Sequence, residues 1–245
     1  MSSRRKSARD RARRELGQNF LVDRGVVRRL VGLLDPSPLP IVELGAGRGA
    51  LTRELLGTGR PVTAVELDPH WAGALRETCP QARVVRCDML AFRFPAEPHV
   101  VVGNLPFGIT TAMTRRLLAL RGWSEAVLLL QWEVARKRST GGTMLTAQWA
   151  PWYEFRCCGR VRASSFRPVP AVDGGVLKVH RRPRPLLPLV EVKRYQRFVG
   201  AVFTGRGRGL AEVVRNVTGH RLRGLPPLPR DLTAESWADL YTATR

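Results

Sequence analysis

Cysteine and histidine are both scarce in this chain of 245 residues, which holds four of each. The cysteines are Cys79, Cys87, Cys157 and Cys158. No two of them form a Cys-x-x-Cys pair, and no group of histidines accompanies them. This spacing argues against a metal site and against a disulfide framework. Four free thiols are therefore expected, as is usual for cytoplasmic proteins.

Long apolar runs are missing as well. No segment approaches the 18 consecutive apolar residues expected of a membrane-spanning helix. The amino terminus is basic, but no apolar stretch follows it, so the pattern does not indicate a signal peptide. We therefore expect a cytoplasmic protein without a membrane partner.

Acidic residues are few, with 20 Asp and Glu against 41 Lys and Arg, which gives a formal net charge of +21. Such an imbalance favours a polyanionic partner, either nucleic acid or an acidic membrane. A codon bias towards arginine would explain the preference for arginine over lysine, but not the excess over acids. The length suits one main domain with a small appendage.

The most informative stretch begins with the apolar run Val100–Val102, whose β-branched residues favour a strand buried on both faces. Gly103 and Pro106 then interrupt it. Asn104 and Phe107 are thereby expected at the carboxyl end of a strand. Ligands bind at that edge of an open α/β sheet.

A glycine-rich loop supplies a second signal. Residues 41–44, which are apolar except for Glu43, predict a strand, and residues 50–56 predict the helix that follows it. Between them Gly45, Gly47 and Gly49 alternate, whereas a dinucleotide fingerprint would place its third glycine three positions after the second. Glycines at these positions allow the backbone to approach a ligand closely.

Acids close the next two predicted strands. Glu66 ends the strand 61–66 and lies 21 residues after Gly45, where an acid can accept hydrogen bonds from ribose hydroxyls. Asp88 follows the strand that starts at Arg83. Because Glu43 also closes a strand, three successive strands end in an acid and the fourth ends in an amide. This order is specific to a methyltransferase sheet.

The remaining elements complete the expected architecture. Helices are predicted over 25–34, 109–120, 195–203, 210–217 and 234–241, and further strands over 126–130, 155–161 and 175–180. Residues 1–14 form a basic arm with seven basic residues and one acid. We expect a catalytic domain over 15–183 and a basic, RNA-binding helical appendage over 184–245.

Four motifs and two single acids occur in the order found in one known family: Gln18-Asn19-Phe20-Leu21, Glu43–Gly49, the acids Glu66 and Asp88, Asn104-Leu105-Pro106-Phe107, and Phe166–Pro170. The chain resembles the Erm branch of the ribosomal RNA adenine dimethyltransferases, which confer macrolide-lincosamide-streptogramin resistance. Gly174 departs from the serine that usually follows Val-Asp there. The resemblance covers nearly the whole chain.

The resemblance implies an α/β, Rossmann-like S-adenosylmethionine-dependent methyltransferase sheet with a small helical C-terminal domain. It implies methylation of the 6-amino group of one adenine in the peptidyl-transferase loop of 23S rRNA, free or in an early ribosomal precursor, by a monomer. The expected cofactor-binding residues are Gln18, Asn19, Leu21, Glu43, Gly45, Gly47, Glu66, Asp88, Met89 and Asn104. The expected catalytic residues are Asn104, Leu105, Pro106, Phe107 and Phe166, the last as a second wall for a flipped base.

Four alternatives stay open at this point. A small-subunit rRNA dimethyladenosine transferase shares the chemistry, although the short appendage and long arginine-rich arm argue against it. A DNA adenine methyltransferase usually carries Pro-Pro before its aromatic residue, whereas this chain has Leu105-Pro106 before Phe107. A small-molecule methyltransferase would fit the glycine loop but would not explain the net charge of +21. A non-catalytic RNA-binding protein on the same fold would not need to keep the turn at Asn104 and the acids intact, as they are here.

Overall fold

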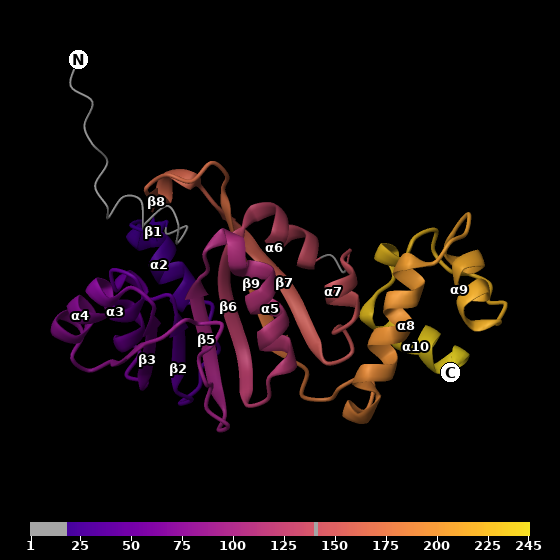
Figure 1. Ribbon diagram of the computed structural model, residues 1–245, viewed down its shortest axis with the longest axis horizontal. Coiled ribbons are helices and arrows are strands. Elements are labelled where there is room, and N and C mark those ends of the chain that lie inside the picture. Colours follow the sequence, from indigo (N-terminus) through magenta and orange to yellow (C-terminus); the bar gives the residue numbers. More distant parts are fainter. Residues whose placement is uncertain (1–18, 140–141) are drawn as a thin grey trace, which may run out of the picture. The chain divides into compact units, whose positions relative to one another are not determined.

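A computed structural model describes residues 19–139 and 142–245 of the chain (Figure 1). The predicted basic arm and Gln18 therefore lie outside the described residues. The strands are β1 (Phe20–Leu21), β2 (Ile41–Leu44), β3 (Val62–Glu66), β4 (Arg83–Arg86), β5 (His99–Asn104), β6 (Trp123–Gln131), β7 (Tyr153–Val161), β8 (Phe166–Arg167) and β9 (Gly174–Arg181). The α-helices are α2 (Arg24–Val31), α3 (Ala50–Leu56), α4 (Pro69–Thr78), α5 (Thr110–Ala119), α6 (Trp132–Ser139), α7 (Met144–Ala147), α8 (Val192–Thr204), α9 (Leu210–Thr218) and α10 (Ala234–Thr244).

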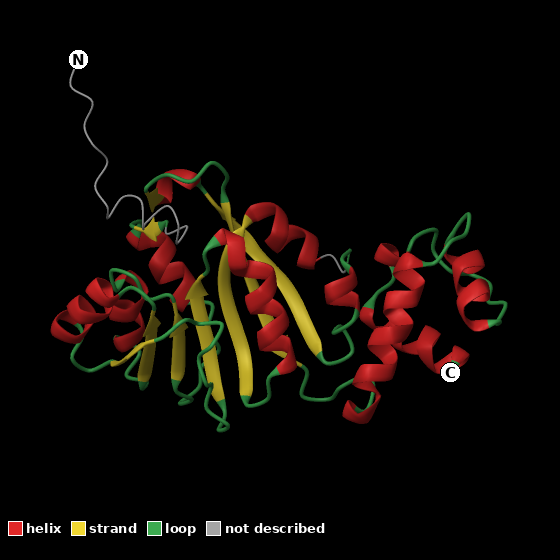
Figure 2. Cartoon of the chain, viewed as in Figure 1, coloured by secondary structure: helices red, strands yellow, loops and turns green. Residues whose placement is uncertain are grey.

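The main sheet of the described residues has the strand order β4-β3-β2-β5-β6-β9-β7 (Figure 2). Strands β4, β3, β2, β5 and β6 pair in parallel. The chain builds outward from β2 through β3 to β4 on one side and then returns to β5 and β6 on the other. The order therefore reverses between β2 and β5, and a crevice at such a switch point is where α/β sheets bind ligands.

The central strands are buried on both faces, as their apolar runs predict. Every residue of β2 is buried, and β5 is buried from His99 to Gly103. Helix α3 packs against β2 and β3, and α4 packs against β3 and β4. Asp68 begins α4 by accepting hydrogen bonds from the N–H groups of His70 and Trp71, at 2.8 and 3.4 Å.

Most element boundaries agree with the sequence. Helix α3 has the predicted bounds, whereas α2 ends at Val31 instead of Leu34, because the Leu33 and Leu34 N–H groups bond three residues back, in tighter turns. Strand β6 starts three residues before the predicted Ala126, and β7 begins at Tyr153. The strands predicted over 155–161 and 175–180 correspond to β7 and β9, which are neighbours in the sheet.

The described residues form two compact units. The first contains the described residues up to Trp132 together with Gly159–Val176, and the second contains Glu133–Cys158 and Leu177–Arg245. The second unit thus includes α6, α7 and most of β7 and β9, in addition to the C-terminal helices. No helix among the described residues has both the length and the apolar character needed to cross a bilayer.

Aromatic side chains hold the second unit together. Trp152 and Tyr153 are 1% and 2% exposed and therefore belong to the core. The Trp152 ring lies 5.4 Å from Tyr195, and Tyr195 lies 5.4 Å from Tyr241, both edge to face. The Tyr195 hydroxyl donates to the Ala147 carbonyl at 2.9 Å, and the Trp152 indole N–H donates to Leu187. The buried polar atoms of these rings are therefore paired.

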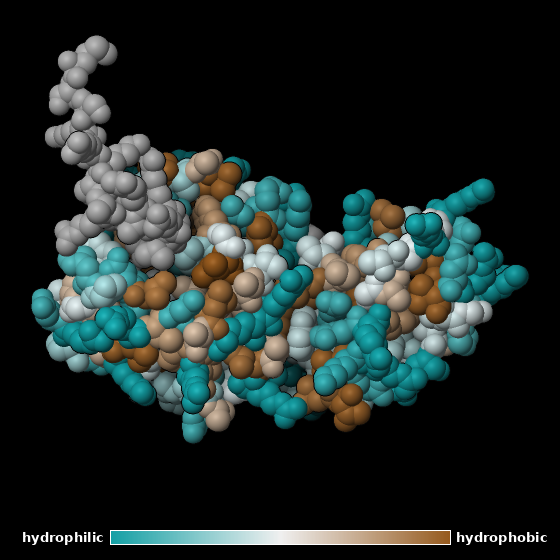
Figure 3. Space-filling view, viewed as in Figure 1, coloured by the Kyte–Doolittle hydropathy of each residue, from teal (hydrophilic) through white to brown (hydrophobic). Residues whose placement is uncertain are grey.

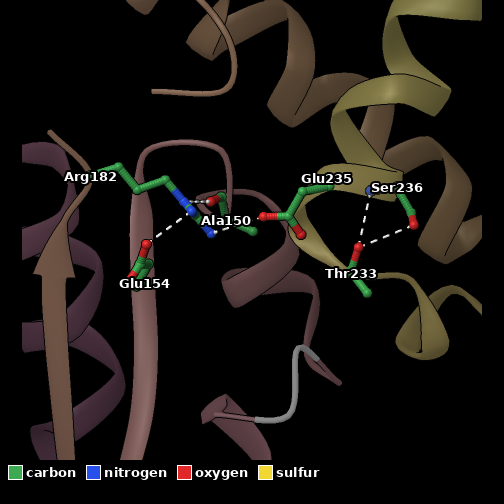
Figure 4. A network of polar contacts seen from close by, with 6 residues as sticks. All are labelled: Ala150, Glu154, Arg182, Thr233, Glu235 and Ser236. Atoms are coloured by element: carbon green, nitrogen blue, oxygen red, sulfur yellow. Dashed lines mark hydrogen bonds and ion pairs between the residues drawn. The ribbon is translucent and has the colours of Figure 1, made fainter. Parts of the chain in front are cut away.

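Arg182 joins β7 to α10 within the second unit (Figure 4). Its guanidinium donates to the Ala150 carbonyl at 3.0 Å and to the Glu154 carboxylate at 3.0 Å, and it lies 3.6 Å from Glu235. Thr233 begins α10 by accepting a hydrogen bond from the Ser236 N–H at 3.1 Å. Hydrophilic residues crowd around α9 on the displayed face of this unit (Figure 3).

Candidate active site

A cavity of about 210 Å³ lies in the first unit, at the carboxyl ends of its parallel strands. It is lined by Asn19, Phe20, Gly45, Gly47, Val65, Glu66, Leu67, Cys87, Asp88, Met89, Leu90, Asn104, Leu105, Pro106, Phe107 and Ile109. These residues lie at the carboxyl ends of β2, β3, β4 and β5 or just after them, apart from Asn19 and Phe20 at the start of β1. The cavity thus lies at the point where the strand order reverses, as expected for an α/β ligand site.

The glycine loop forms one wall of the cavity with its backbone. Gly45 and Gly47 have φ angles of 72° and 52°, which favour glycine. A Cβ on Gly45 would lie 3.1 Å from Met89, and a Cβ on Gly47 would lie 3.1 Å from the Phe20 ring. The N–H groups of Gly45 and Ala46 donate to the Val65 carbonyl, so β3 holds the loop in place.

Glu66 fixes the loop and presents a carboxylate at the cavity wall. It accepts hydrogen bonds from the N–H groups of Gly47 and Asp68, at 2.7 and 2.8 Å. Burial raises the pKa of Glu66, and these two N–H groups offset part of the increase. Each carboxylate oxygen has a second lone pair that can accept a further hydrogen bond, for example from a ribose hydroxyl.

Asp88 and Met89 lie where β4 leaves the sheet. One Asp88 carboxylate oxygen accepts a hydrogen bond from the Leu90 N–H at 2.8 Å, which fixes the side chain. Leu67, Leu90 and Ile109 add apolar surface to this part of the lining. An apolar wall beside a fixed carboxylate suits a flat heterocycle that carries an amino group.

Asn104 ends β5, and a backbone carbonyl of the same chain orients its side-chain amide. The side-chain N–H donates to the Asn19 carbonyl at 2.8 Å. The Asn104 side-chain oxygen and the Leu105 carbonyl accept no hydrogen bond from any residue that the structure describes. The Leu105 N–H is anchored to the Leu129 carbonyl at 3.0 Å. Two acceptors are therefore available on adjacent residues beside the cavity.

Phe107 follows at the start of a short 3-10 turn, Phe107–Ile109. Pro106 precedes it with an extended backbone, and the Ile109 N–H closes the turn on the Pro106 carbonyl at 3.1 Å. The Phe107 side chain is half-buried and lines the cavity. Its ring face is thus available beside the two acceptors.

Phe166 and Leu21 do not line the cavity. They pair with each other across the antiparallel strands β1 and β8 and are 0% and 5% exposed. A Cβ on Gly174 would lie 3.2 Å from the Phe166 ring, so the absence of a side chain there leaves room for the ring in the core. The expected second wall for a base is therefore absent from this arrangement, because packing behind β1 buries Phe166.

Glu43 also lies outside the lining, beneath the glycine loop. It is 1% exposed, and its carboxylate accepts a hydrogen bond from the Thr52 hydroxyl at 2.6 Å. Burial raises the pKa of Glu43 to about 7, although the Thr52 hydroxyl opposes the shift. A structural contact between β2 and α3 thus replaces the expected direct contact with cofactor.

This raised pKa predicts a pH-dependent effect of Glu43→Gln on stability. Ionising the buried carboxyl costs stability, and that cost grows as the pH rises from about 4.5 to about 7. The variant should therefore gain thermal stability over the parent at pH 8 and lose the advantage at pH 4.5. A shift of this size is worth on the order of 3 kcal/mol.

Melting curves at the two pH values test the prediction, with Glu77→Gln as a control because Glu77 is exposed on α4. A stability difference between Glu43→Gln and the parent that did not change with pH would show that the carboxyl is not held protonated by burial.

Sequence reasoning did not identify six residues that line the cavity: Phe20, Val65, Leu67, Cys87, Leu90 and Ile109. Five of them are direct sequence neighbours of predicted site residues, which is the signal that could have located them. The Arg48 guanidinium lies over the Phe20 ring, 4.6 Å from its centre, and 5.0 Å from the centre of the Trp71 ring. This stack joins the glycine loop to β1 and α4.

The sheet, the glycine loop, the acids at two strand ends and the amide on β5 define an S-adenosylmethionine-dependent methyltransferase. The family model described as ribosomal RNA adenine dimethylase matches residues 9–226. The chain belongs to the ribosomal RNA adenine dimethylase family.

Individual proteins support this assignment. The chain is 50% identical to the mycinamicin-resistance protein MyrB of Micromonospora griseorubida, over 95% of this chain and 79% of that protein. It is 46% identical to an rRNA adenine N-6-methyltransferase of Corynebacterium diphtheriae, over 85% and 84%. The crystal structure of the 23S rRNA methyltransferase ErmE matches with a TM-score of 0.81 and 32% identity, covering 92% of this chain and 99% of that one.

The cavity fits the cofactor of this class. Because Gly45 and Gly47 have no side chains, the ligand can lie directly against the backbone of the loop. Glu66 supplies acceptors for the ribose hydroxyls of the cofactor. Asp88 and the apolar residues near it suit the adenine. When bound, S-adenosylmethionine supplies an electrophilic methyl group on a sulfonium.

Glu66→Ala is expected to weaken S-adenosylmethionine binding by about 1–3 kcal/mol, because ribose hydroxyls would lose their acceptors and Gly47 its partner. Isothermal calorimetry measures this, with Glu77→Gln as the exposed control. The parent protein should bind S-adenosylmethionine or its demethylated product and not NAD. Tight binding of NAD alone would refute this account of the cavity.

Proposed function

We propose that the chain methylates the 6-amino group of a single adenine in the peptidyl-transferase loop of 23S rRNA and thereby confers macrolide-lincosamide-streptogramin resistance. The arrangement of Asn104, Leu105 and Phe107 at the cavity carries the proposal, because it offers two acceptors and a ring to one exocyclic amine. The names of MyrB, of the Corynebacterium enzyme and of ErmE support the substrate.

The chemistry needs these groups because the amine of adenine is a poor nucleophile, with its lone pair delocalised into the ring. The Asn104 oxygen and the Leu105 carbonyl accept its two hydrogens and favour a pyramidal nitrogen with a directed lone pair. The methylated nitrogen then sheds a proton readily to water, so a strong base is not required. Orientation and fixed dipoles are the main catalytic contributions of the chain.

Phe107 stacks on the target base, which must leave its own stack to enter the cavity. Pro106 stiffens the turn so that ring and amide keep their relative position. Asn19 takes part through its carbonyl, which orients the Asn104 amide at 2.8 Å. We assign these three roles to the turn that ends β5 and to the residue that precedes β1.

The proposal also assigns cofactor binding and RNA binding to different segments of the chain. Residues 15–183 bind the cofactor and carry catalysis, while the basic arm 1–14 and the helical appendage 184–245 bind RNA. Residues 181–245 hold thirteen Lys and Arg against five Asp and Glu. The enzyme acts in the cytoplasm as a monomer, on 23S rRNA that is free or in an early ribosomal precursor.

Expression in a macrolide-sensitive bacterium tests this function. Cells producing the parent protein should grow at macrolide concentrations that stop cells producing Asn104→Ala at equal level. Their 23S rRNA, and not their 16S rRNA, should gain N6-methyladenine. Methylation confined to 16S rRNA would instead support a small-subunit enzyme such as the relative in Chlorobium chlorochromatii, which is 33% identical.

A further inference from the structure

Six exposed arginines lie on two neighbouring segments of the first unit, and we call them the arginine face. They are Arg24, Arg28 and Arg29 on α2 and Arg160, Arg162 and Arg167 on residues 159–167.

Three contacts place the two segments side by side. The Val22 N–H donates to the Ser165 carbonyl at 2.9 Å, and the Ser165 hydroxyl donates to the Asp23 carboxylate at 3.0 Å. The Arg29 guanidinium donates to the Arg160 carbonyl at 3.2 Å. The six charges therefore belong to one surface.

Little negative charge lies on these segments. Residues 22–31 and 159–173 contain two acids, Asp23 and Asp173. Asp23 is engaged as the cap of α2, where it accepts hydrogen bonds from two N–H groups, and these together with the Ser165 hydroxyl lower its pKa. Asp173 pairs with Arg160 at 2.6 Å. The guanidiniums of the other five arginines form no ion pair with either of these acids.

Three of the guanidiniums, those of Arg24, Arg28 and Arg162, make no hydrogen bond or ion pair with any described residue, although the Arg162 charge helps lower the pKa of Asp173. Arg24 and Arg28 are four residues apart on α2, so both point from one face of the helix. Planar guanidiniums with unused donors are suited to phosphate oxygens, which they bind in pairs of hydrogen bonds.

The arginine face continues directly from the wall of the cavity. Asn19 and Phe20 line the cavity, and Phe20 pairs with Arg167 across β1 and β8. Three residues separate Phe20 from Arg24 along the chain. The same short segments thus contribute both to the cavity wall and to the arginine face, which places these charges near the entry of a target adenine.

We propose that the arginine face binds the phosphate backbone of the substrate RNA next to the target adenine. This proposal rests on the proposed function. The face fixes the position of the RNA strand and reads no bases, because its groups are charges matched to phosphates and not to base edges. It also forms an RNA contact within the catalytic unit, separate from the arm and from the C-terminal helices.

The test compares two triple variants that remove the same charge. Arg24→Gln/Arg28→Gln/Arg162→Gln changes the face, and Arg76→Gln/Arg83→Gln/Arg93→Gln removes three exposed arginines that do not line the cavity. Filter binding to a 23S rRNA fragment with the peptidyl-transferase loop, at several salt concentrations, gives the slope of log affinity against log salt. Each lost phosphate contact should flatten that slope by about one.

The face variant should lose affinity and flatten the slope by about two to three, while the control variant stays near the parent and both keep cofactor affinity. A third variant with lysine at the three face positions should restore most of the slope, because it keeps the charges. Equal slopes for the face and control variants would overturn the proposal and assign the RNA contacts to the arm or to residues 184–245.

The outcome is separable from the proposed function. If the parent protein failed to methylate 23S rRNA, the proposed function would fail, but the slopes would still show whether the face binds RNA. If the parent methylated 23S rRNA and the face variant had an unchanged slope, the face proposal alone would fail.

Discussion

Asn104→Ala should lower the single-turnover rate of methylation by about a hundredfold or more, because it removes an oriented acceptor beside the reacting amine. Affinity for S-adenosylmethionine should change little, since the contact belongs to the target base. Rapid-quench measurements with labelled cofactor and saturating rRNA give the rate, and calorimetry gives the cofactor affinity.

Two variants show whether the lost acceptor is the cause. Asn104→Asp keeps an oxygen but loses the N–H that donates to the Asn19 carbonyl, so its rate should lie between those of Ala and the parent. Asn216→Ala removes a similar contact, from an exposed amide to the Arg206 carbonyl at 2.9 Å, and should leave the rate unchanged. A near-normal rate for Asn104→Ala would show that this amide does not assist the reaction.

Phe107→Ala is expected to have the second large effect. Stacking of a base on an aromatic ring is worth about 1–3 kcal/mol, and without the ring the flipped adenine is held less firmly beside the acceptors. The loss should appear in kcat/KM for rRNA. Phe107→Tyr should be mild, because the ring face remains.

Phe107→Leu separates stacking from simple apolar contact, since it keeps apolar volume at a half-buried position without a π face. It should resemble Phe107→Ala. A leucine variant as active as the parent would show that any apolar side chain suffices there, and the stacking role would be wrong.

The sequence predicted the fold well because the parallel strands carry unusually clear signals. The segments Ile41–Leu44 and Val100–Val102 favour strands covered on both faces, and a glycine loop follows the first while Asn104 ends the second. Residues on parallel strands meet at one edge of the sheet, so spacing along the chain located Glu66, Asp88 and Asn104 at the same cavity.

Burial could not be predicted in the same way. Glu43 and Phe166 belong to motifs, but whether a motif side chain faces the ligand or the core depends on contacts between distant segments. Glu43 is engaged by Thr52, and Phe166 fills the space left by Gly174. The arginine face depends on such contacts as well, since α2 and residues 159–167 are far apart in sequence.

The orientation of Asn104 is the other feature that required a structure. A motif shows that an amide is present, but not which of its two atoms faces the substrate. The hydrogen bond from the amide nitrogen to the Asn19 carbonyl decides this and leaves the oxygen as acceptor. A backbone contact of this kind leaves no signature in the side chains of the sequence.

The central claim is that this cavity methylates one adenine of 23S rRNA. The most direct measurement is incubation of bare 23S and 16S rRNA with purified protein and methyl-labelled cofactor, followed by mapping of the labelled nucleotide. The account predicts label on the N6 atom of a single adenine in the peptidyl-transferase loop of 23S rRNA, and labelling about a hundredfold slower with Asn104→Ala. Label on 16S rRNA, at several scattered adenines, or at equal level with Asn104→Ala would contradict it.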